Sequence, residues 1–432
     1  MYDNLDSNNG YSMALHTDYN ELTVQCLKAA KGKRRPMIEL FVDKNTPDEI
    51  WNTAFEVMRS HGGQPAFYNT SLLEKMQKRF KINETDIKCF CGGGCTESMI
   101  AGYSNVGSLD AGINLLLILE KTIYKYLPKA ENFKEFYKTY IGEVKSVVDE
   151  VTEKISLSQE ERALYNPLPM RTLLIDDCID NETEYNSGGA RYNWSIVNFA
   201  GMINVIDSML TIKEFVFDDC KIGAEDFCDK LRCNDSNFLS ACRRCKTVFG
   251  TDNNAANQFA YKLSSDVFSM LDNKKPHIGK AFIPASIQFM SQADAGKHIG
   301  ATPDGREAGQ PLCDSLGAIF GKDQKGPTAL LKSVTSIDLN RAVGVPVLNF
   351  NIDEKWNNDI LKALILSYME MGGIQMQITC ISKELLQEAY KKPDEHKNLV
   401  VRVGGYSEYF CRLTDELRKM ILDRTIQKAE SI

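Results

Sequence analysis

The feature that most constrains the fold is a unit repeated along the 432 residues: a short apolar run, a turn, and an amphipathic helix. Apolar runs that alternate with amphipathic helices predict an α/β fold. Residues 36–44 are one expected strand. After it, Thr46 at the N-cap, Pro47 at the first helical position and Glu49 predict a helix that starts with a capping box. We expect this helix to end at the glycine pair 62–63.

Two further elements are expected near the C-terminus. The run Leu399–Val403 predicts a strand, and residues 413–426 predict a helix. Three apolar side chains of that helix are expected to face inward: Leu417, Ile421 and Ile426. The apolar run 115–120 is shorter than the roughly 20 residues that cross a bilayer, so it indicates a buried helix.

Composition narrows the class of protein. Apolar residues make up 43% and charged residues 25%, which is typical of a globular chain. The net charge of −7, with both signs interspersed, argues against nucleic acid or an anionic membrane as a partner. The first 21 residues have no basic flank and no apolar core, so they are not a signal peptide. We therefore expect a cytoplasmic protein.

The thirteen cysteines predict thiols rather than a disulfide framework, because their number is odd and no secretion signal is present. Cys242 and Cys245 form a C-x-x-C, but a zinc site needs a second close pair of ligands. Cys89 and Cys91 are expected to be packing residues. The five histidines offer no metal-ligand spacing, and no phosphate loop or dinucleotide fingerprint is present. We expect no permanently bound metal or cofactor.

The segment Cys91–Ser98, CGGGCTES, combines three glycines with a thiol and a carboxylate. Glycines allow close backbone approaches, which suits a thin loop that carries Cys95 into a crowded interior. In extended geometry Glu97 would share the face of Cys95, giving a hydrogen-atom or nucleophile site beside a base. Two alternatives remain open from the residues alone: a structural cysteine beside glycines, and a Glu97 that caps a following helix.

The segment Val400–Phe410, VVRVGGYSEYF, places a glycine pair at the end of an expected strand. The residues alone indicate only that Gly405 lacks a side chain and is bracketed by bulky neighbours.

Together these segments resemble the glycyl radical enzyme family. The run around Gly405 resembles the radical signature R-V-x-G-Y-S, and Gly94, Cys95, Thr96 and Glu97 resemble the family's G-C-x-E cysteine loop. Further blocks resemble the family in the same order: 62–69, 188–193, 207–209, 301–314, 326–329, 372–377 and 393–395. The resemblance extends from about residue 31 to the C-terminus.

The resemblance implies a mechanism. An activating enzyme that uses S-adenosylmethionine and an iron–sulfur cluster would remove one hydrogen from Gly405. The Gly405 radical would take hydrogen from Cys95, and the Cys95 thiyl would abstract hydrogen from a small-molecule substrate. Arg402 and Tyr406 would support the radical loop. Because oxygen cleaves a chain at such a radical, the resemblance implies an anaerobic bacterium.

The residue after the thiol separates branches of the family. Pyruvate formate-lyase uses two adjacent cysteines, whereas Thr96 follows Cys95 here. The C-x-E pattern resembles the eliminases, which implies a dehydratase or a C–O, C–N or C–S lyase with Glu97 as base. An arylacetate-type radical decarboxylase is the alternative. A radical-storing repair or regulatory subunit is a third reading, but such repair proteins lack the cysteine loop.

The matching blocks correspond to the C-terminal half of longer relatives. The resemblance therefore implies the second half of a ten-stranded barrel, with the cysteine and glycyl loops inside it. We expect a leader and partner-docking segment at 1–30, a half-barrel catalytic domain at 31–395 and a glycyl radical domain at 396–432. An open half-barrel would leave an unpaired edge, so we expect a separate N-terminal-half subunit, in a split enzyme that can form a dimer of such pairs. Truncation of a longer chain is the competing explanation.

Two residues depart from the family pattern. Gly404 stands where relatives more often carry Ala, Ser or Cys, and Glu408 stands where a small residue is commoner. A bulky acid at position 408 is expected to alter how the radical loop swings out to the activating enzyme.

Overall fold

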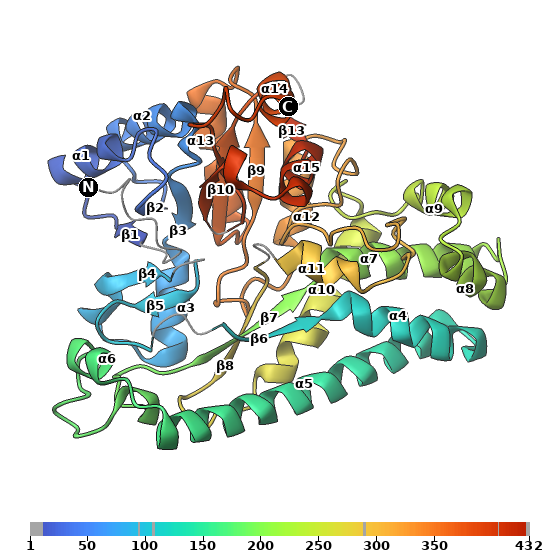
Figure 1. The fold of residues 1–432 in the computed structure, drawn as a ribbon, viewed down its shortest axis with the longest axis horizontal. Helices are drawn as coiled ribbons and strands as arrows, with labels where there is room; N and C mark the ends of the chain where they lie inside the picture. The colour runs from blue at the N-terminus through green and yellow to red at the C-terminus, as the bar shows by residue number, and fades with distance from the viewer. Residues whose placement is uncertain (1–11, 94–95, 106–108, 288–290, 405, 429–432) are drawn as a thin grey trace.

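The computed structural model describes residues 12–93, 96–105, 109–287, 291–404 and 406–428. They form an α/β fold in which two larger sheets are surrounded by helices (Figure 1). The α/β class expected from the sequence is confirmed. Within the described ranges, no helix is both long and apolar enough to cross a membrane.

The larger sheet has six strands in the order β1-β2-β3-β10-β9-β13. Its strands are β1 (Ser12–Leu15), β2 (Met37–Val42), β3 (Ala66–Asn69), β10 (Gln375–Cys380), β9 (Asn349–Ile352) and β13 (Ile426–Gln427). Strands β1, β2 and β3 run parallel to one another, as do β10, β9 and β13, and β3 meets β10 antiparallel. The sheet therefore joins two parallel groups of opposite direction.

The second sheet is parallel and has three strands, β6 (Leu109–Asn114), β7 (Ser195–Ala200) and β8 (Phe282–Ala285). Backbone N–H groups of Gly344 and Val347, just before β9, donate to the carbonyls of Pro284 and Ser286 at 3.3 and 3.2 Å. This segment thus connects β8 with the start of β9. Strands β1 to β3 lie in the same sheet as β9 and β10. Residues 12–29 of the expected leader are part of this body as β1 and a helix.

Fifteen α-helices are assigned among the described residues, and the longest, α5, runs along one side of the molecule (Figure 1). The helices are α1 (Glu21–Ala29), α2 (Asp48–Val57), α3 (Ser71–Phe80), α4 (Leu115–Tyr126), α5 (Phe133–Tyr165), α6 (Pro169–Leu174), α7 (Met202–Ile212), α8 (Ala224–Arg232), α9 (Ser236–Arg243), α10 (Asn254–Phe268), α11 (Ser291–Lys297), α12 (Pro327–Thr335), α13 (Asn358–Glu370), α14 (Lys383–Lys391) and α15 (Asp415–Asp423).

The expected start of α2 is wrong in detail. The N-cap is Pro47, and no side chain caps the helix. The Thr46 hydroxyl instead accepts from the Asp43 N–H at 2.9 Å and contacts the Tyr19 hydroxyl at 2.9 Å. This tertiary contact removes Thr46 from the capping box. The expected end is confirmed, because Gly63 adopts a left-handed conformation after a π-helical turn over Met58–Gly62.

The C-terminal elements are close to expectation. Residues Val400–Arg402 form strand β11, and Leu417 and Ile421 of α15 are buried. The predicted inward-facing helical position of Ile426 is wrong, because α15 ends at Asp423 and Ile426 lies in β13. There it pairs with Asn351 of β9. Pairing with the main sheet thus prevails over the helical spacing of the apolar residues.

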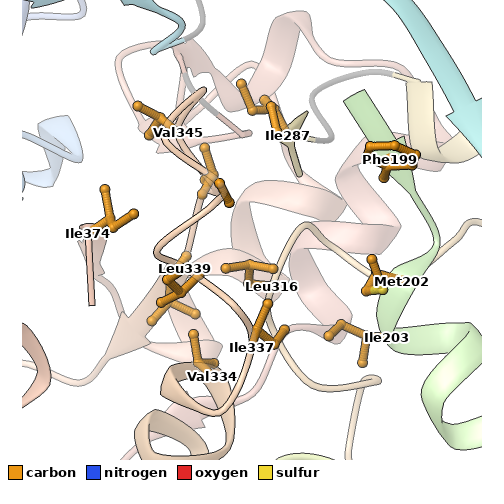
Figure 2. Packing of buried hydrophobic residues seen from close by; sticks show 14 of the residues in the cluster. Phe199, Met202, Ile203, Ile287, Leu316, Val334, Ile337, Leu339, Val345 and Ile374 are labelled. Carbon is orange, nitrogen blue, oxygen red and sulfur yellow. The ribbon is translucent and has the colours of Figure 1, made fainter. Parts of the chain in front are cut away.

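Two apolar cores hold these elements. The larger one includes the region in Figure 2, where Met202 and Ile203 lie toward Leu316 and Ile337. The smaller core is formed by eleven buried residues between Ile381 and Ile421, contributed by α14, β11 and α15 among others. Elements α14, β11 and α15 therefore pack around a separate apolar core.

Candidate functional site

One face of the six-stranded sheet is polar yet buried. Strand register places Glu39, Tyr68, Gln375 and Gln377 on the same face, and all four are 0% exposed. The opposite face is apolar and covered by helices, as where Trp51 of α2 stacks at 5.7 Å on Phe67. Buried polar side chains are costly unless they are bonded, so a polar sheet face sealed from solvent indicates a functional interior.

A hairpin bearing the cysteine loop lies against this interior. Its strands are β4 (Phe90–Gly92) and β5 (Ser98–Ile100), paired antiparallel. The Gly93 N–H donates to the Glu97 carbonyl at 2.6 Å, and the Thr96 N–H donates to the Gly93 carbonyl at 2.9 Å. The predicted site residue Cys95, with Gly94, lies outside the described residues. The described residues on either side of it form an antiparallel hairpin.

Two buried carboxylates explain the glycines at 92 and 93. A Cβ at Gly92 would overlap Oε1 of Glu39, and a Cβ at Gly93 would lie 2.9 Å from Oε2 of Glu97. Both carboxylates are buried, Glu39 at 0% and Glu97 at 6% exposure. The close approach expected of this glycine-rich loop is therefore confirmed at these two positions.

One expectation about Glu97 fails, and one of the alternatives left open for it is excluded. The extended geometry expected for residues 95–97 is wrong at Thr96, whose φ of 82° is left-handed. A helix cap at Glu97 is also excluded, because strand β5 follows it directly. The tight turn that buries Thr96 takes the place of the expected extended strand.

A second hairpin carries the glycyl segment. Strands β11 and β12 (Ser407–Tyr409) pair antiparallel, and the Val403 N–H donates to the Tyr406 carbonyl at 3.0 Å. Gly405 lies outside the described residues. Tyr406 is half-buried and packs against the smaller core. The described residues that flank each of the two predicted reactive positions therefore form a hairpin.

Arg402 attaches the second hairpin to the polar face. It is 1% exposed, its Nε donates to Oε1 of Gln377, and its Nη1 donates to the Ser407 hydroxyl at 3.2 Å. Gly63 packs against the same hairpin, since a Cβ there would lie 3.4 Å from the Arg402 Cβ and from the Ser407 hydroxyl. The expected supporting position of Arg402 thus has a physical basis in its contact with β10.

Glu39 is a site residue that sequence reasoning missed. Its Oε2 accepts from the Gly92 N–H at 2.6 Å, and its Oε1 is buried with no hydrogen-bond partner among the described residues. Burial raises the pKa of Glu39 to about 7, although the Gly92 N–H and the charge of Arg402 oppose the shift. The signal available in the sequence was a charged residue at the centre of an apolar strand.

Arg424 and Asp314 were also missed. The Arg424 guanidinium donates to the carbonyl of Arg402 at 2.5 Å and to that of Val403, and it pairs with Asp314 at 2.6 Å. Burial raises the pKa of Asp314, an effect that Arg424 opposes. Arg424 follows α15, so the chain after the glycyl hairpin turns back to hold that hairpin's first strand.

Glu408 has a partner that explains its size. Its carboxylate pairs with Arg34 at 2.8 Å, and the Arg34 guanidinium also lies 5.5 Å from the centre of the Tyr409 ring. The pair joins β12 to the segment before β2. The acid at position 408 therefore holds the glycyl hairpin on the side opposite to its first strand.

Among the other described thiols, Cys242 and Cys245 are buried and Cys91 is half-buried, whereas Cys220 and Cys233 are exposed. Burial raises the pKa of Cys91 and of Cys242 to about 12, and that of Cys245 to about 11. Cys245 donates from its thiol to Glu214 at 3.1 Å. In the part of the chain that is described, one group of side chains could meet around a metal ion, the largely exposed Glu388, Glu395 and His396.

Comparison with known families decides the assignment. The family model described as pyruvate formate lyase-like matches residues 10–296, and the one described as glycine radical matches residues 314–411. The chain belongs to the pyruvate formate lyase-like family. The glycyl hairpin of this family member lies within the glycine radical match, and the cysteine hairpin lies within the pyruvate formate lyase-like match.

Individual relatives agree with this family. The chain is 27% identical over 421 residues to trans-4-hydroxy-L-proline dehydratase from Clostridioides difficile, covering 91% of the chain and 52% of that protein. It is 24% identical over 445 residues to indoleacetate decarboxylase from Tractidigestivibacter scatoligenes, covering 92% and 50%. The glycerol-bound B12-independent glycerol dehydratase from Clostridium butyricum superposes with a TM-score of 0.89 at 27% identity, over 95% of this chain and 55% of that one. The chain spans about half the length of the curated relatives it matches.

Proposed function

We propose that this chain carries the radical-bearing part of a glycyl radical eliminase. Gly405 stores the radical, Cys95 delivers it to a small hydroxylated substrate, and Glu97 is the base. The observation that carries the proposal is the presence of both hairpins on one buried polar region, within a chain that matches the glycine radical model. An activating enzyme that uses S-adenosylmethionine and an iron–sulfur cluster would create the radical.

The proposed reaction begins and ends with the radical on Gly405. A hydrogen atom moves from the Cys95 thiol to Gly405, and the Cys95 thiyl then takes a hydrogen atom from the substrate carbon that bears the hydroxyl. Glu97 removes the hydroxyl proton, and the ketyl expels the neighbouring leaving group with its electron pair. The product radical takes a hydrogen atom back from Cys95, and the Cys95 thiyl regains one from Gly405. Glu97 is buried, so its carboxylate can take the hydroxyl proton in a site from which water is largely excluded.

Glu97→Gln tests the role of the base. The variant keeps the shape of the side chain but cannot accept a proton, so we expect elimination to fall by about a hundredfold or more. The glycyl radical signal should form to the same extent as in the parent. Unchanged turnover of the hydroxylated substrate by Glu97→Gln would remove Glu97 from the reaction.

Radical decarboxylation is the second candidate, and similarity to indoleacetate decarboxylase favours it. The two reactions release different small molecules. An anaerobic screen of diols, hydroxylated amino acids and arylacetates, with carbon dioxide and the carbonyl product measured, separates them. Carbon dioxide release from an arylacetate without a carbonyl product would replace elimination by decarboxylation.

We also propose that a second polypeptide completes the barrel. In the described part of the chain, β1 and β6 each have a strand partner on one side only, and each could accept a further strand. The active unit would be a heteromer, or a dimer of such pairs, in an oxygen-free cytoplasm. Mass spectrometry of the active complex purified from its source should find this 48.6 kDa chain together with a separate partner chain of similar or larger mass. A single continuous polypeptide that contains this sequence would contradict the proposal.

A further inference from the structure

Glu39 lies between the two hairpins. It is at the centre of β2 and 0% exposed, and its Oε2 holds the Gly92 N–H at 2.6 Å. On its other side it lies within electrostatic range of Arg402, on the first strand of the glycyl hairpin. Gly92 precedes Cys95 by three positions, and Arg402 precedes Gly405 by three. One carboxylate therefore acts on both hairpins, in each case three positions before the expected reactive residue.

The two oxygens of this carboxylate differ in their hydrogen bonding. Oε1 of Glu39 is buried without a hydrogen-bond partner among the described residues, and a Cβ at Gly92 would overlap it. A buried unpaired carboxylate oxygen is destabilising, and sites keep such groups where function requires them. Packing alone would be served better by an apolar side chain, as on the opposite face of β2.

The charged and titratable groups around Glu39 come from four elements. Arg402 of β11 attracts its carboxylate, whereas Glu97 of the cysteine hairpin repels it. Tyr68 of β3 and Cys91 of β4 are also affected by its charge, and both keep their protons because burial raises their pKa values. Ser12 of β1 adds a hydroxyl. Arg402 is thus the cation among these groups.

We propose, building on the proposed function, that Glu39 is a positioning residue for hydrogen transfer between Gly405 and Cys95. Its Oε2 fixes the cysteine hairpin through Gly92, and its charge draws in Arg402 and with it the glycyl hairpin. Hydrogen-atom transfer requires the donor and acceptor to be in near contact, so a small displacement of one hairpin slows it strongly.

Hydrogen transfer can be observed without substrate. In D2O the Cys95 thiol becomes S–D, and the Gly405 radical then takes a deuterium atom from it. When the Cys95 thiyl takes back the protium, the radical glycine retains deuterium. The doublet that one α-hydrogen gives in electron paramagnetic resonance then collapses toward a singlet, and the rate of collapse reports the transfer.

Glu39→Gln removes the charge but keeps an oxygen that can accept from Gly92, and Glu39→Ala removes both. We expect collapse to slow by about tenfold to a hundredfold in Glu39→Gln, and further in Glu39→Ala, while the radical still forms. Glu214→Gln is the control, because it removes a largely buried carboxylate that pairs with Lys221 at 2.7 Å, outside both hairpins. The control should match the parent.

The pH profile separates positioning from packing. Above about pH 7 the Glu39 carboxylate is ionised and attracts Arg402, and below it the carboxyl is neutral. Transfer in the parent should slow as the pH falls through this range, and Glu39→Gln should lack that dependence. Equal collapse rates in parent and Glu39→Gln would overturn the inference. An unchanged rate of collapse together with a loss of substrate turnover would also overturn it, because Glu39 would then act on the substrate. A parent that forms no glycyl doublet would instead refute the proposed function.

Discussion

Arg424 donates a hydrogen bond of 2.5 Å to the carbonyl of Arg402, and so the chain after α15 holds the strand that leads to Gly405. The same guanidinium reaches the Val403 carbonyl and pairs with Asp314, so three separate segments meet at one side chain. Under the proposed function, Gly405 must be sealed during turnover yet reached by an activating enzyme. This contact is placed where it would control that opening.

Arg424→Lys should loosen the glycyl hairpin. Lysine keeps the positive charge beside Asp314 but lacks the planar fork that reaches two carbonyls. Loss of hydrogen bonds from a charged group costs about 1.5 to 3 kcal/mol, so hydrogen exchange of residues 400–409 should speed up by about tenfold or more. Mass spectrometry of the peptide that contains these residues measures the exchange rate. Arg232→Lys, at an exposed pair with Asp229, should change nothing there; equal exchange in Arg424→Lys would contradict the clamp.

The Arg34–Glu408 pair should couple β12 to the segment before β2. Both side chains are largely buried, at 8% and 16% exposure, so the pair should contribute more than a surface pair. In a double-mutant cycle with Arg34→Met and Glu408→Gln, urea unfolding should give a coupling of about 1 kcal/mol or more. The exposed pair Glu150–Lys154 on α5 provides the matched control, with a coupling of about 0.3 to 0.5 kcal/mol. Equal coupling free energies for the two pairs would show that the Arg34–Glu408 contact contributes no more to stability than an exposed pair does.

Gly92→Ala and Gly93→Ala should each destabilise the protein. Both added methyl groups would collide with a buried glutamate carboxylate, and overpacking costs about 1 to 3 kcal/mol. Gly142→Ala is the contrasting variant, because a Cβ at this helical position meets nothing within 4 Å. It should stabilise the protein by about 0.5 to 1 kcal/mol. Thermal unfolding measures all three, and a neutral Gly92→Ala would contradict the close approach of Glu39.

Glu39 should make stability depend on pH. Its folded pKa of about 7 is raised from the ordinary value of 4.5, so the folded state retains the proton more strongly. The resulting stabilisation is fully present below pH 4.5 and is lost as the pH rises through 7, by about 3 kcal/mol in total. Relative to the parent, Glu39→Gln should therefore gain stability between pH 5 and pH 8. A difference in unfolding free energy that stays constant over this range would contradict the buried, titrating carboxyl.

The sequence was informative where local chemistry determines the structure. The glycine-rich run around Cys95 predicted a crowded loop, and the strand before Gly405 was predicted within a residue of its ends. Apolar spacing failed at Ile426, because pairing with β9 is a tertiary contact. The capping box failed at Thr46 for the same reason, since Tyr19 and Asp43 engage its hydroxyl.

The parts of the site that the sequence did not reveal depend on contacts between distant residues. Glu39 approaches Gly92 only because β2 lies beneath the cysteine hairpin, and Arg424 approaches Asp314 only because the C-terminal segment returns to the main sheet. In the sequence, Glu39 is a single acidic residue in an apolar strand. Arg424 is one of many basic residues and lies near the end of an expected helix. Their roles follow from strand order and register, which residue patterns alone do not specify.

Electron paramagnetic resonance of the anaerobically activated protein measures whether Gly405 stores a radical. The parent should give a doublet from a single α-hydrogen, which should be retained in Glu97→Gln and absent from Gly405→Ala. Air should cleave the activated parent at Gly405 into a large fragment and a short C-terminal peptide. A Gly405→Ala protein that gives the same doublet would show that the radical does not reside on Gly405.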